Sequence, residues 1–341
     1  MGLFKPNSYR RPPVQKMPEG ATPTAVGEDA RPLLGIFFKI VSTFSFFLMV
    51  TALKWVSDDV PVTQSVFSRN FFGLFPIFIM MGYNGMLIQG WKTKRPGTHF
   101  TRAIIGVAGM ACGFVGFTLI PLPDATAIGF SGPLIVVVLA AVLLKETVRI
   151  YRWSAVLVGF VGVIITVLPH LGQGGGSFGS NIGAMFSFMG AFFGAFAMIT
   201  VRKLCETERT ATIVLWFTFS SSVLSALTYP LGWFYPEMAW VMPNMHDALC
   251  LIGVGIFGGI GQIFLTQSYR YADASTIAPF DYMNMVWAIL FGYMLFAEVP
   301  TNEVLIGSCI VIAAGVFVIW RERQLGYDRT RARRASTPSK F

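Results

Sequence analysis

The stretch that decides the fold is "DASTIAPFDYMNMVWAILFGYMLFAE", Asp273–Glu298, an apolar run that contains Pro279 and the ionisable residue Asp281. A related element, "DATAIGFSGPLIVVVLAAVLLKE", occupies Asp124–Glu146. Both begin with Asp-Ala, continue through a Pro-interrupted apolar run and end in Glu. Each run has about the ~20 residues that an α-helix needs to cross a bilayer. The repeated element therefore indicates a membrane protein built from two related halves.

The composition excludes an ordinary soluble domain. The chain has 341 residues, of which 54% are hydrophobic and 13% charged, and its mean hydropathy is +0.61. A soluble domain needs a more charged surface. The four cysteines are widely spaced, and His99, His170 and His246 stand singly near the ends of apolar blocks, where we expect surface roles. No pair of cysteines has the spacing of metal ligands, so no metal site is predicted. No phosphate-binding loop follows a strand, which argues against an ATP-driven pump, and no cofactor is predicted.

The apolar blocks predict ten membrane spans. They are Pro32–Leu53, Val62–Met81, Ala103–Ile120, Ala125–Leu144, Ser154–Leu168, Ile182–Val201, Ala211–Trp233, Ala248–Tyr269, Ala274–Phe296 and Val304–Trp320. With the N-terminus inside, nearly all of the 26 Lys and Arg residues fall on the cytoplasmic side, as the positive-inside rule requires. Both termini are therefore predicted to be cytoplasmic. Because this charge sets topology, the net charge of +9 does not indicate nucleic-acid binding.

The spans predict a division of the chain into five parts. These are a disordered cytoplasmic tail (1–31), a first five-helix repeat (32–168), an outer linker (169–181), a second five-helix repeat (182–320) and a basic cytoplasmic tail (321–341), expected to be disordered after Arg323. Five is an odd number, so the two repeats must have opposite orientations in the membrane. The predicted fold class is an all-α integral membrane protein of ten transmembrane helices arranged as two inverted five-helix repeats. Such repeats are typical of secondary transporters.

Three stretches carry a resemblance to a known family. They are "SVFSRNFFGLFPIF", Ser65–Phe78, and the two repeated elements described above. From about Leu33 to Trp320 the chain resembles the drug/metabolite transporter superfamily, in its ten-span branch with two EamA-type halves. It looks most similar to bacterial carriers of S-adenosylmethionine and riboflavin. The second repeated element has more residues between its Asp and its closing Glu than the first. The two broken spans are therefore not equivalent.

The resemblance implies a multi-pass secondary transporter of the bacterial inner (plasma) membrane. Its expected partner is a small-to-medium polar or amphipathic organic metabolite, moved across the bilayer by alternating access. The substrate is expected to be riboflavin-like or S-adenosylmethionine-like. Proton coupling and a homodimer are left open, as are import and export.

Three ionised groups are predicted to lie well inside the spans: Lys39, Arg69 and Asp281. A charge at mid-bilayer costs ~2.5–3.5 kcal/mol on insertion scales, so each should face a partner or a cavity. The helical rise of ~1.5 Å per residue places Arg69 and Asp281 at similar depth, which predicts that they form an ion pair. The pair either fixes helix packing or lines the substrate path. Lys39 either joins this path or extends to the cytoplasmic interface.

Polar residues at helical spacing on four spans predict a shared cavity, and two tryptophans lie away from the span ends where an aromatic belt belongs. The predicted substrate-binding residues are Lys39, Ser42, Thr43, Ser68, Arg69, Trp216, Gln262, Thr266, Tyr269, Asp281, Tyr282, Asn284 and Trp287. Pro133 and Pro279 are the predicted hinges, because each removes a helical hydrogen bond. They are expected to approach each other across the two-fold axis that relates the halves. Asp281 is the only candidate proton carrier.

Other functions remain as alternatives. Within the same family, the chain would be an exporter of amino acids or drugs. From other classes, it would be a channel or a membrane-embedded enzyme. An enzyme would need carboxylates, histidines or a Ser-His pair gathered at one depth, and no buried histidine is expected. Counterflow in vesicles separates these classes, because a carrier shows it and a channel or an enzyme does not.

The topology generates a first prediction. A cysteine introduced at Ser177, in the predicted outer linker, should react with an impermeant thiol reagent added to intact cells. If it is labelled only after lysis, the ten-span topology is wrong.

Overall fold

Every regular element in the described part of the chain is helical. The computed structural model describes residues 32–83, 85, 87–143, 150–171, 178–205, 208, 210–271 and 277–335. The α-helices are α1 (Pro32–Trp55), α2 (Val62–Tyr83), α3 (Pro96–Leu119), α4 (Leu122–Gly129), α5 (Ser131–Leu143), α6 (Ile150–Leu171), α7 (Phe178–Cys205), α8 (Thr210–Ala226), α9 (Met245–Tyr271), α11 (Met283–Phe296) and α12 (Asn302–Ala335). The short 3₁₀ segments are η1 (Gln89–Trp91), η2 (Tyr229–Trp233), η3 (Pro236–Met238) and η4 (Ala278–Tyr282).

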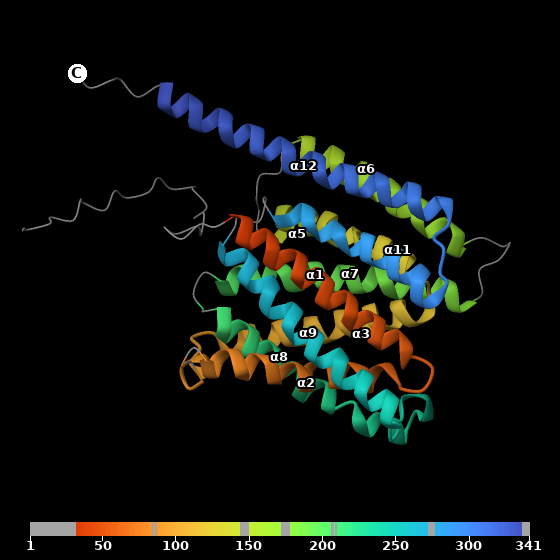
Figure 1. Cartoon of the computed structure of the whole chain (residues 1–341). Coiled ribbons are helices and arrows are strands. Elements are labelled where there is room, and N and C mark those ends of the chain that lie inside the picture. The colour runs from red at the N-terminus through yellow and green to blue at the C-terminus, as the bar shows by residue number, and fades with distance from the viewer. Residues whose placement is uncertain are drawn as a thin grey trace, which may run out of the picture.

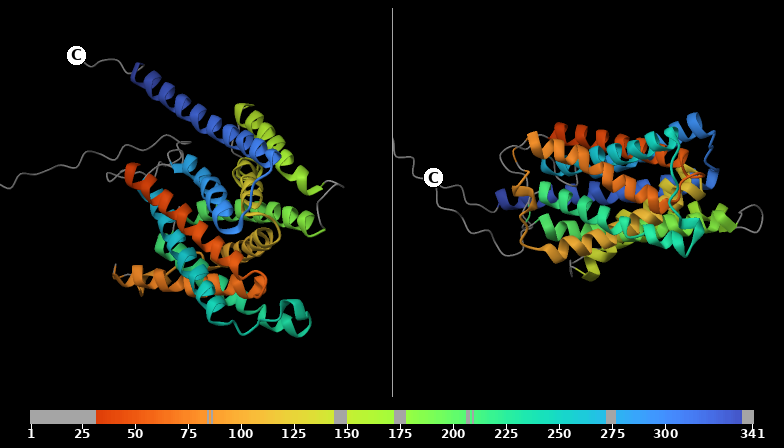
Figure 2. Two further views of the ribbon diagram at one scale, coloured as in Figure 1. Left: turned by 45° about the vertical axis from the view of Figure 1, so that its right-hand side comes forward. Right: turned by 90° about the horizontal axis from the view of Figure 1, so that it is seen from below.

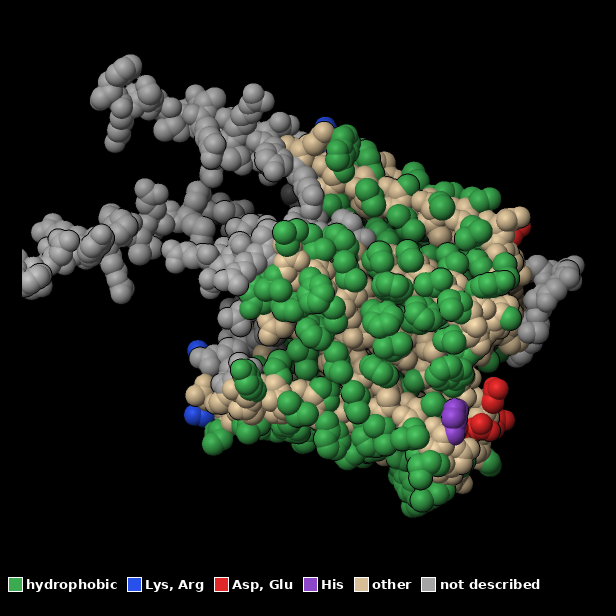
Figure 3. Space-filling model, viewed as in Figure 1, with side chains coloured by type: hydrophobic (Ala, Val, Ile, Leu, Met, Phe, Trp, Pro, Cys, Tyr) green, Lys and Arg blue, Asp and Glu red, His purple; other side chains and the backbone are tan. Residues whose placement is uncertain are grey.

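The helices have the length and surface of membrane spans. Nine helical segments among the described residues are long and apolar enough to cross a bilayer, and Phe280–Phe296 is a shorter apolar helix. On the face shown in Figure 3, hydrophobic side chains cover the middle of the molecule. The visible Lys and Arg side chains lie near the edge from which the tails emerge, and Asp and Glu lie at the opposite edge. This surface suits a bilayer between two aqueous phases.

The helices run roughly along one direction (Figures 1 and 2), and the helix pairs that join the two halves follow a symmetric pattern. In chain order, the first span packs on the eighth as α1 on α9, and the sixth span packs on the third as α7 on α3. Exchanging the two halves converts one pair into the other. The helices α2 and α8 pack on each other, as do α6 and α12, and each of these pairs maps onto itself in the exchange. This is the arrangement expected of two inverted repeats.

Both spans of the repeated element are broken. In the first half, α4 ends at Gly129 and α5 begins at Ser131. In the second half, the 3₁₀ segment η4 precedes α11. The prolines do not kink the middle of a helix as the sequence suggested. Pro133 lies in the first turn of α5 and Pro279 in the first turn of η4, where backbone N–H groups lack helical partners anyway.

The hinge assignments stay predictions. Pro133 is exposed on α5, and the side chain of Pro279 lies outside the described part of the chain.

Two helix ends differ from the predicted spans. The helix α12 continues to Ala335, through a segment that was expected to be disordered after Arg323. This segment is rich in Arg and Ala, which favour helix. The helix α3 begins at Pro96 instead of Ala103, since proline suits the first helical position. Arg102, assigned from the sequence to a loop, therefore lies inside a span.

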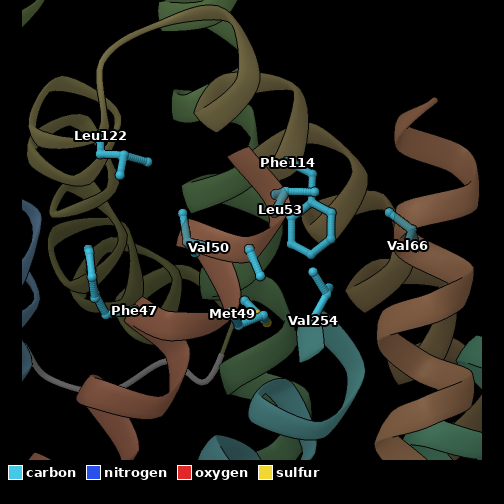
Figure 4. Close-up of a cluster of buried hydrophobic side chains, with 9 residues drawn as sticks. Phe47, Met49, Val50, Leu53, Val66, Phe114, Leu122 and Val254 are labelled. Carbon is cyan, nitrogen blue, oxygen red and sulfur yellow. The ribbon is translucent and has the colours of Figure 1, made fainter. Parts of the chain in front are cut away.

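A buried apolar cluster joins the halves near the end of the bundle at which α1 finishes. It combines Phe47, Met49, Val50, Ala52, Leu53, Val66, Phe114, Leu122 and Val254 (Figure 4). These side chains come from α1, α2, α3, α4 and α9. We call the end of the bundle where α1 begins the N-terminal end, and the other the opposite end.

Glycines allow the closest helix contacts. A Cβ atom added at Gly190 of α7 would lie 2.8 Å from the backbone nitrogen of Gly113 in α3. One added at Gly255 of α9 would lie 2.7 Å from the carbonyl oxygen of Ser68 in α2. Both approaches are to backbone atoms, which cannot turn aside as a side chain can. Small residues therefore set the spacing of the helices, as is common in membrane bundles.

This packing generates a second prediction. Gly190→Ala should destabilise the protein by ~1–3 kcal/mol, because the added methyl group overpacks the contact of α3 with α7. Gly194→Ala is the matched control on the same helix, since a Cβ there would meet nothing within 4 Å. The melting temperature in detergent should fall for the first variant only. Equal melting temperatures would show that α3 and α7 are not packed at Gly190.

Candidate functional site

An ion pair joins the two halves at the centre of the candidate site. Lys39 Nζ of α1 lies 2.6 Å from Asp281 Oδ1 of η4. The side chain of Lys39 is 2% exposed and that of Asp281 is 39% exposed. Lys39 is thus buried and paired, and does not extend to the interface. Asp281 remains accessible on one side, so this pair has a face on which a ligand or water can act.

The predicted pairing of Asp281 with Arg69 is wrong. The helical rise gave the depth of each residue but not the direction in which its side chain points. In the structure α1 packs against η4, whereas α2 packs against α8 and α9. The Lys39 amine therefore reaches Asp281, and Arg69 faces another part of the bundle.

A second contact lies one to two turns further along both elements. Trp287 Nε1 donates a hydrogen bond to Thr43 Oγ1 over 3.3 Å, and the hydroxyl of Thr43 donates to the carbonyl oxygen of Ile40. The indole of Trp287 also meets the ring of Phe44 edge to face, with 5.3 Å between centroids. Of the predicted site residues, the structure thus brings Lys39, Thr43, Asp281 and Trp287 together between α1 and the η4–α11 segment.

Other predicted site residues lie in helix contacts of this conformation. Ser42 Oγ donates to the carbonyl oxygen of Gly261 over 2.8 Å, which joins α1 to α9. Thr266 Oγ1 donates to the carbonyl oxygen of Gln262 within α9, and Ser68 is buried between α2 and α9. The side chain of Tyr269 lies outside the described part of the chain.

The observed contacts of two predicted residues, Tyr282 and Trp216, do not lie at the ion pair. Tyr282 points toward Gly315 of α12 and packs edge to face on Phe130, with 5.3 Å between centroids. Trp216 donates to the carbonyl oxygen of Trp91 and stacks on His99. Asn284 is half-buried on α11. Consecutive residues of a helix point in different directions, which separates Tyr282 from Asp281.

Arg69 lies instead beside Arg102, a residue that the sequence analysis missed. Both guanidinium carbons lie over the ring of Phe217 in α8, at 5.8 Å for Arg69 and 4.0 Å for Arg102. Arg69 donates one hydrogen bond, to Asn70 Oδ1. Within the part of the chain that the structure describes, neither arginine has a carboxylate partner. The helix start at Pro96 was the signal that could have placed Arg102 in a span.

Enclosing the positive charge of these two arginines costs more free energy than their observed contacts offset. Desolvating an ion costs several kcal/mol even after relaxation. A cation–π contact returns ~2 kcal/mol when it is desolvated. A single aromatic ring and the hydrogen bond to Asn70 therefore offset only part of the cost of enclosing the Arg69 guanidinium and the Nε and Nη1 atoms of Arg102.

A polar network closes the opposite end of the bundle. Lys54 at the end of α1 pairs with Glu298, and its Nζ atom donates to the carbonyl oxygen of Ile120 over 3.3 Å. Glu298 Oε2 accepts a hydrogen bond from Leu122 N over 2.8 Å. The network joins α1, the turn between α3 and α4, and Glu298, the second residue after α11. Glu298 is the Glu that closes the repeated element, but sequence position did not reveal its partners.

Two histidines that were expected at the surface are buried, so that expectation is wrong. His170 Nε2 lies 3.0 Å from Asp124 Oδ2, and His170 Nδ1 lies 2.5 Å from Ser180 Oγ. His99 is fully buried beside Trp216. A histidine near a span end can point inward when a carboxylate or an aromatic ring on a neighbouring helix contacts it. The sequence does not show which helices become neighbours.

The N-terminal end also carries a contact between the halves. Glu208 Oε1 accepts hydrogen bonds from Thr93 Oγ1 and from Lys94 N, over 2.8 and 2.7 Å. Burial acts to raise the pKa of Glu208, but these hydrogen bonds outweigh it and the pKa is lowered. The contact ties the connection between α2 and α3 to the connection between α7 and α8.

Comparison with known proteins identifies the family. Residues 33–168 and 181–321 each match the EamA-like transporter family. The chain is a member of this family. Together with the apolar helices, the match makes the protein a multi-pass membrane transporter.

Several relatives are named transporters of small organic metabolites. The "S-adenosylmethionine uptake transporter" of Rickettsia felis is 27% identical over 292 residues, covering 86% of this chain and 94% of the relative. The "Riboflavin transporter" of Rhizobium johnstonii is 24% identical over 298 residues, with coverage of 86% and 94%. The "Pseudopaline exporter CntI" of Pseudomonas aeruginosa is 25% identical over 284 residues, covering 82% and 94%.

One solved crystal structure supports the fold. It superposes with a TM-score of 0.60 at 16% identity, covering 85% of this chain and 97% of the other. The resemblance to the EamA-type branch of the drug/metabolite transporters, drawn from the sequence, is thus confirmed.

The exposures of Lys39 and Asp281 generate a third prediction. Asp281→Asn should destabilise the protein by up to ~3 kcal/mol, because it removes the negative charge that lies against the deeply buried Lys39. Lys39→Met should cost less, since the exposed side of Asp281 can be hydrated. The double variant should recover most of the lost stability. Melting temperatures in detergent give the comparison, with Asp58→Asn at an exposed position as the control.

The opposite order would contradict this account of the pair. If Lys39→Met were the more damaging change, Asp281 would have to be the more deeply buried member.

Proposed function

We propose that the protein is an alternating-access secondary carrier of the bacterial inner membrane, with both termini in the cytoplasm. The observation that carries the proposal is the partly accessible Lys39–Asp281 pair between the two halves. The halves are also held together at the opposite end by Glu298 with Lys54 and by the apolar cluster. A carrier needs a site between its halves and closures that open in turn.

The accessible side of Asp281 suggests how the ion pair would respond to a substrate or a proton. In this conformation Lys39 neutralises the carboxylate. A substrate with a cationic group can take the place of Lys39, or a proton can neutralise Asp281. Either event weakens the link of α1 to η4. Reorganisation at this link would then be coupled to occupancy, which is what a carrier requires.

The proposed cargo is a small-to-medium polar or amphipathic organic metabolite. The site combines a cation, a carboxylate, a hydroxyl and an indole, which suits a molecule with both polar groups and a flat or apolar part. Riboflavin-like and S-adenosylmethionine-like compounds match this description, and two relatives carry those substrates in their names. Export of amino acids or drugs is the alternative within the family, and one relative is named an exporter.

Counterflow tests the proposal. Purified protein in liposomes loaded with unlabelled metabolite should transiently accumulate the labelled compound from outside, for at least one member of a panel that includes S-adenosylmethionine, riboflavin and amino acids. A channel would equilibrate the label without overshoot. Absence of overshoot for every compound that enters the liposomes would overturn the carrier assignment.

Asp281 supplies a fourth prediction, which concerns the proton. If Asp281 carries the coupling proton, Asp281→Asn should lose accumulation driven by a pH gradient but retain counterflow, since exchange needs no net proton movement. Asp58→Asn is again the control. Unchanged pH-driven accumulation in Asp281→Asn would exclude Asp281 as the proton carrier.

A further inference from the structure

Arg69, which is buried, and Arg102, which is half-buried, form a site that the carrier proposal does not use. We call Arg69, Arg102 and Phe217 the arginine cluster. It lies where α2, α3 and α8 meet, and the Lys39–Asp281 pair lies between α1 and η4. Arg69 is 6% exposed. The Nε and Nη1 atoms of Arg102 are fully buried and have no hydrogen-bond acceptor among the described residues.

Two glycines provide the space that the guanidinium groups occupy. A Cβ atom added at Gly106 would lie 2.5 Å from both Arg102 Nη1 and Phe217 Cε2. One added at Gly258 would lie 3.2 Å from Arg69 Nε. Glycine at these two positions therefore leaves room for the arginine side chains, since a methyl group at either one would lie too close to an arginine nitrogen.

Residues close in sequence to the cluster carry further buried polar atoms without hydrogen-bond partners in the described part of the chain. Ser65 lies one helical turn from Arg69 on α2, and Ser221 lies one turn from Phe217 on α8. The hydroxyls of both serines are buried without a hydrogen-bond partner in the described part of the chain. Both ring nitrogens of His99, one turn before Arg102 on α3, are in the same condition. Unpaired polar atoms are rare in a protein interior, and these belong to residues one helical turn from the members of the arginine cluster.

We propose that the arginine cluster binds an oxyanion, a carboxylate or a phosphate group, of the transported metabolite. This inference rests on the proposed function and deepens it, because it assigns an anionic group to the cargo. Guanidinium groups hold oxyanions with two parallel N–H···O bonds, and two arginines supply both the charge and the donors that such a group requires. The ring of Phe217 holds the guanidinium groups in place while the site is empty.

A purely structural role gives different expectations. If the arginines only fix α2 and α3 on Phe217, replacing either one should lower stability in the absence of any ligand. If the arginines instead bind an anion, replacing either one removes a desolvated charge that has no carboxylate partner in the described part of the chain. The protein without ligand should then be no less stable, and only the response to anions should be lost.

The experiment measures ligand-induced stabilisation of the purified full-length protein in non-ionic detergent. The probes are benzoate and inorganic phosphate, at constant ionic strength in sodium chloride. Benzamide is the neutral match for benzoate. The variants are Arg69→Gln and Arg102→Gln, with Lys92→Gln at an exposed position as the control. Melting temperatures are read by size-exclusion chromatography after heating.

We expect benzoate or phosphate, but not benzamide, to raise the melting temperature of the wild type and of Lys92→Gln. Each arginine variant should lose about tenfold or more in apparent affinity, the size expected for removing a hydrogen bond to a charged group. A rise with benzoate alone assigns the site to carboxylates, and a rise with phosphate alone assigns it to phosphates.

Three results would overturn the proposal. They are no rise with either anion, an equal rise in the arginine variants, and arginine variants that are less stable than the wild type without ligand. Counterflow of the wild type is measured on the same preparation. Counterflow without an anion response rejects the site and keeps the carrier, whereas an anion response without counterflow rejects the carrier and keeps the site.

Discussion

A charge buried among helices in a bilayer must be neutralised nearby, and the place of its neighbour decides which helices are held together. Along α1, Lys39 pairs with Asp281 and Lys54 pairs with Glu298. The two lysines are separated by roughly 22 Å of helix, at ~1.5 Å per residue. The first span is thus tied to the ninth at two levels. Separating them at one level while the other holds would turn the two spans about the remaining pair, which is the motion that alternating access needs.

Two other helix pairs between the halves allow such motion because small residues make their contacts. Glycines let α2 meet α9, and α3 meet α7, backbone to backbone. In hydrocarbon the lipid competes with apolar side chains, so close backbone packing replaces the hydrophobic effect as the source of association. A contact without interlocking large side chains also offers little resistance to sliding. The fourth and ninth spans are also interrupted, and an interruption of the α-helix between α4 and α5 or at η4 permits the two parts of a span to move differently.

The fold was predictable from the sequence because its determinants are local. Span length and the repeated element predicted the apolar helices and the two related halves, and the three quoted stretches predicted the family. Helical spacing proposed Lys39, Thr43, Asp281 and Trp287 as site residues, and this role stays a prediction. The directions of side chains were not predictable, since they depend on which helices become neighbours. This explains why Asp281 was assigned to Arg69, why His170 was expected at the surface, and why Arg102 was placed in a loop. The same limit applied to Trp216 and Tyr282, whose side chains point toward α3 and α12.

The distribution of charge between the two sites bears on the chemistry of the cargo. The described interior around α1, α2 and α3 contains the cations Lys39, Arg69 and Arg102, and Asp281 is the carboxylate that neutralises one of them. The remaining positive charge is costly for as long as the interior is empty, so any molecule that brings negative charge is stabilised there. A molecule that also brings a cationic group can engage the accessible face of Asp281. A metabolite carrying both kinds of charge would therefore satisfy the two sites together, whereas an inorganic ion would satisfy one and leave the other unchanged.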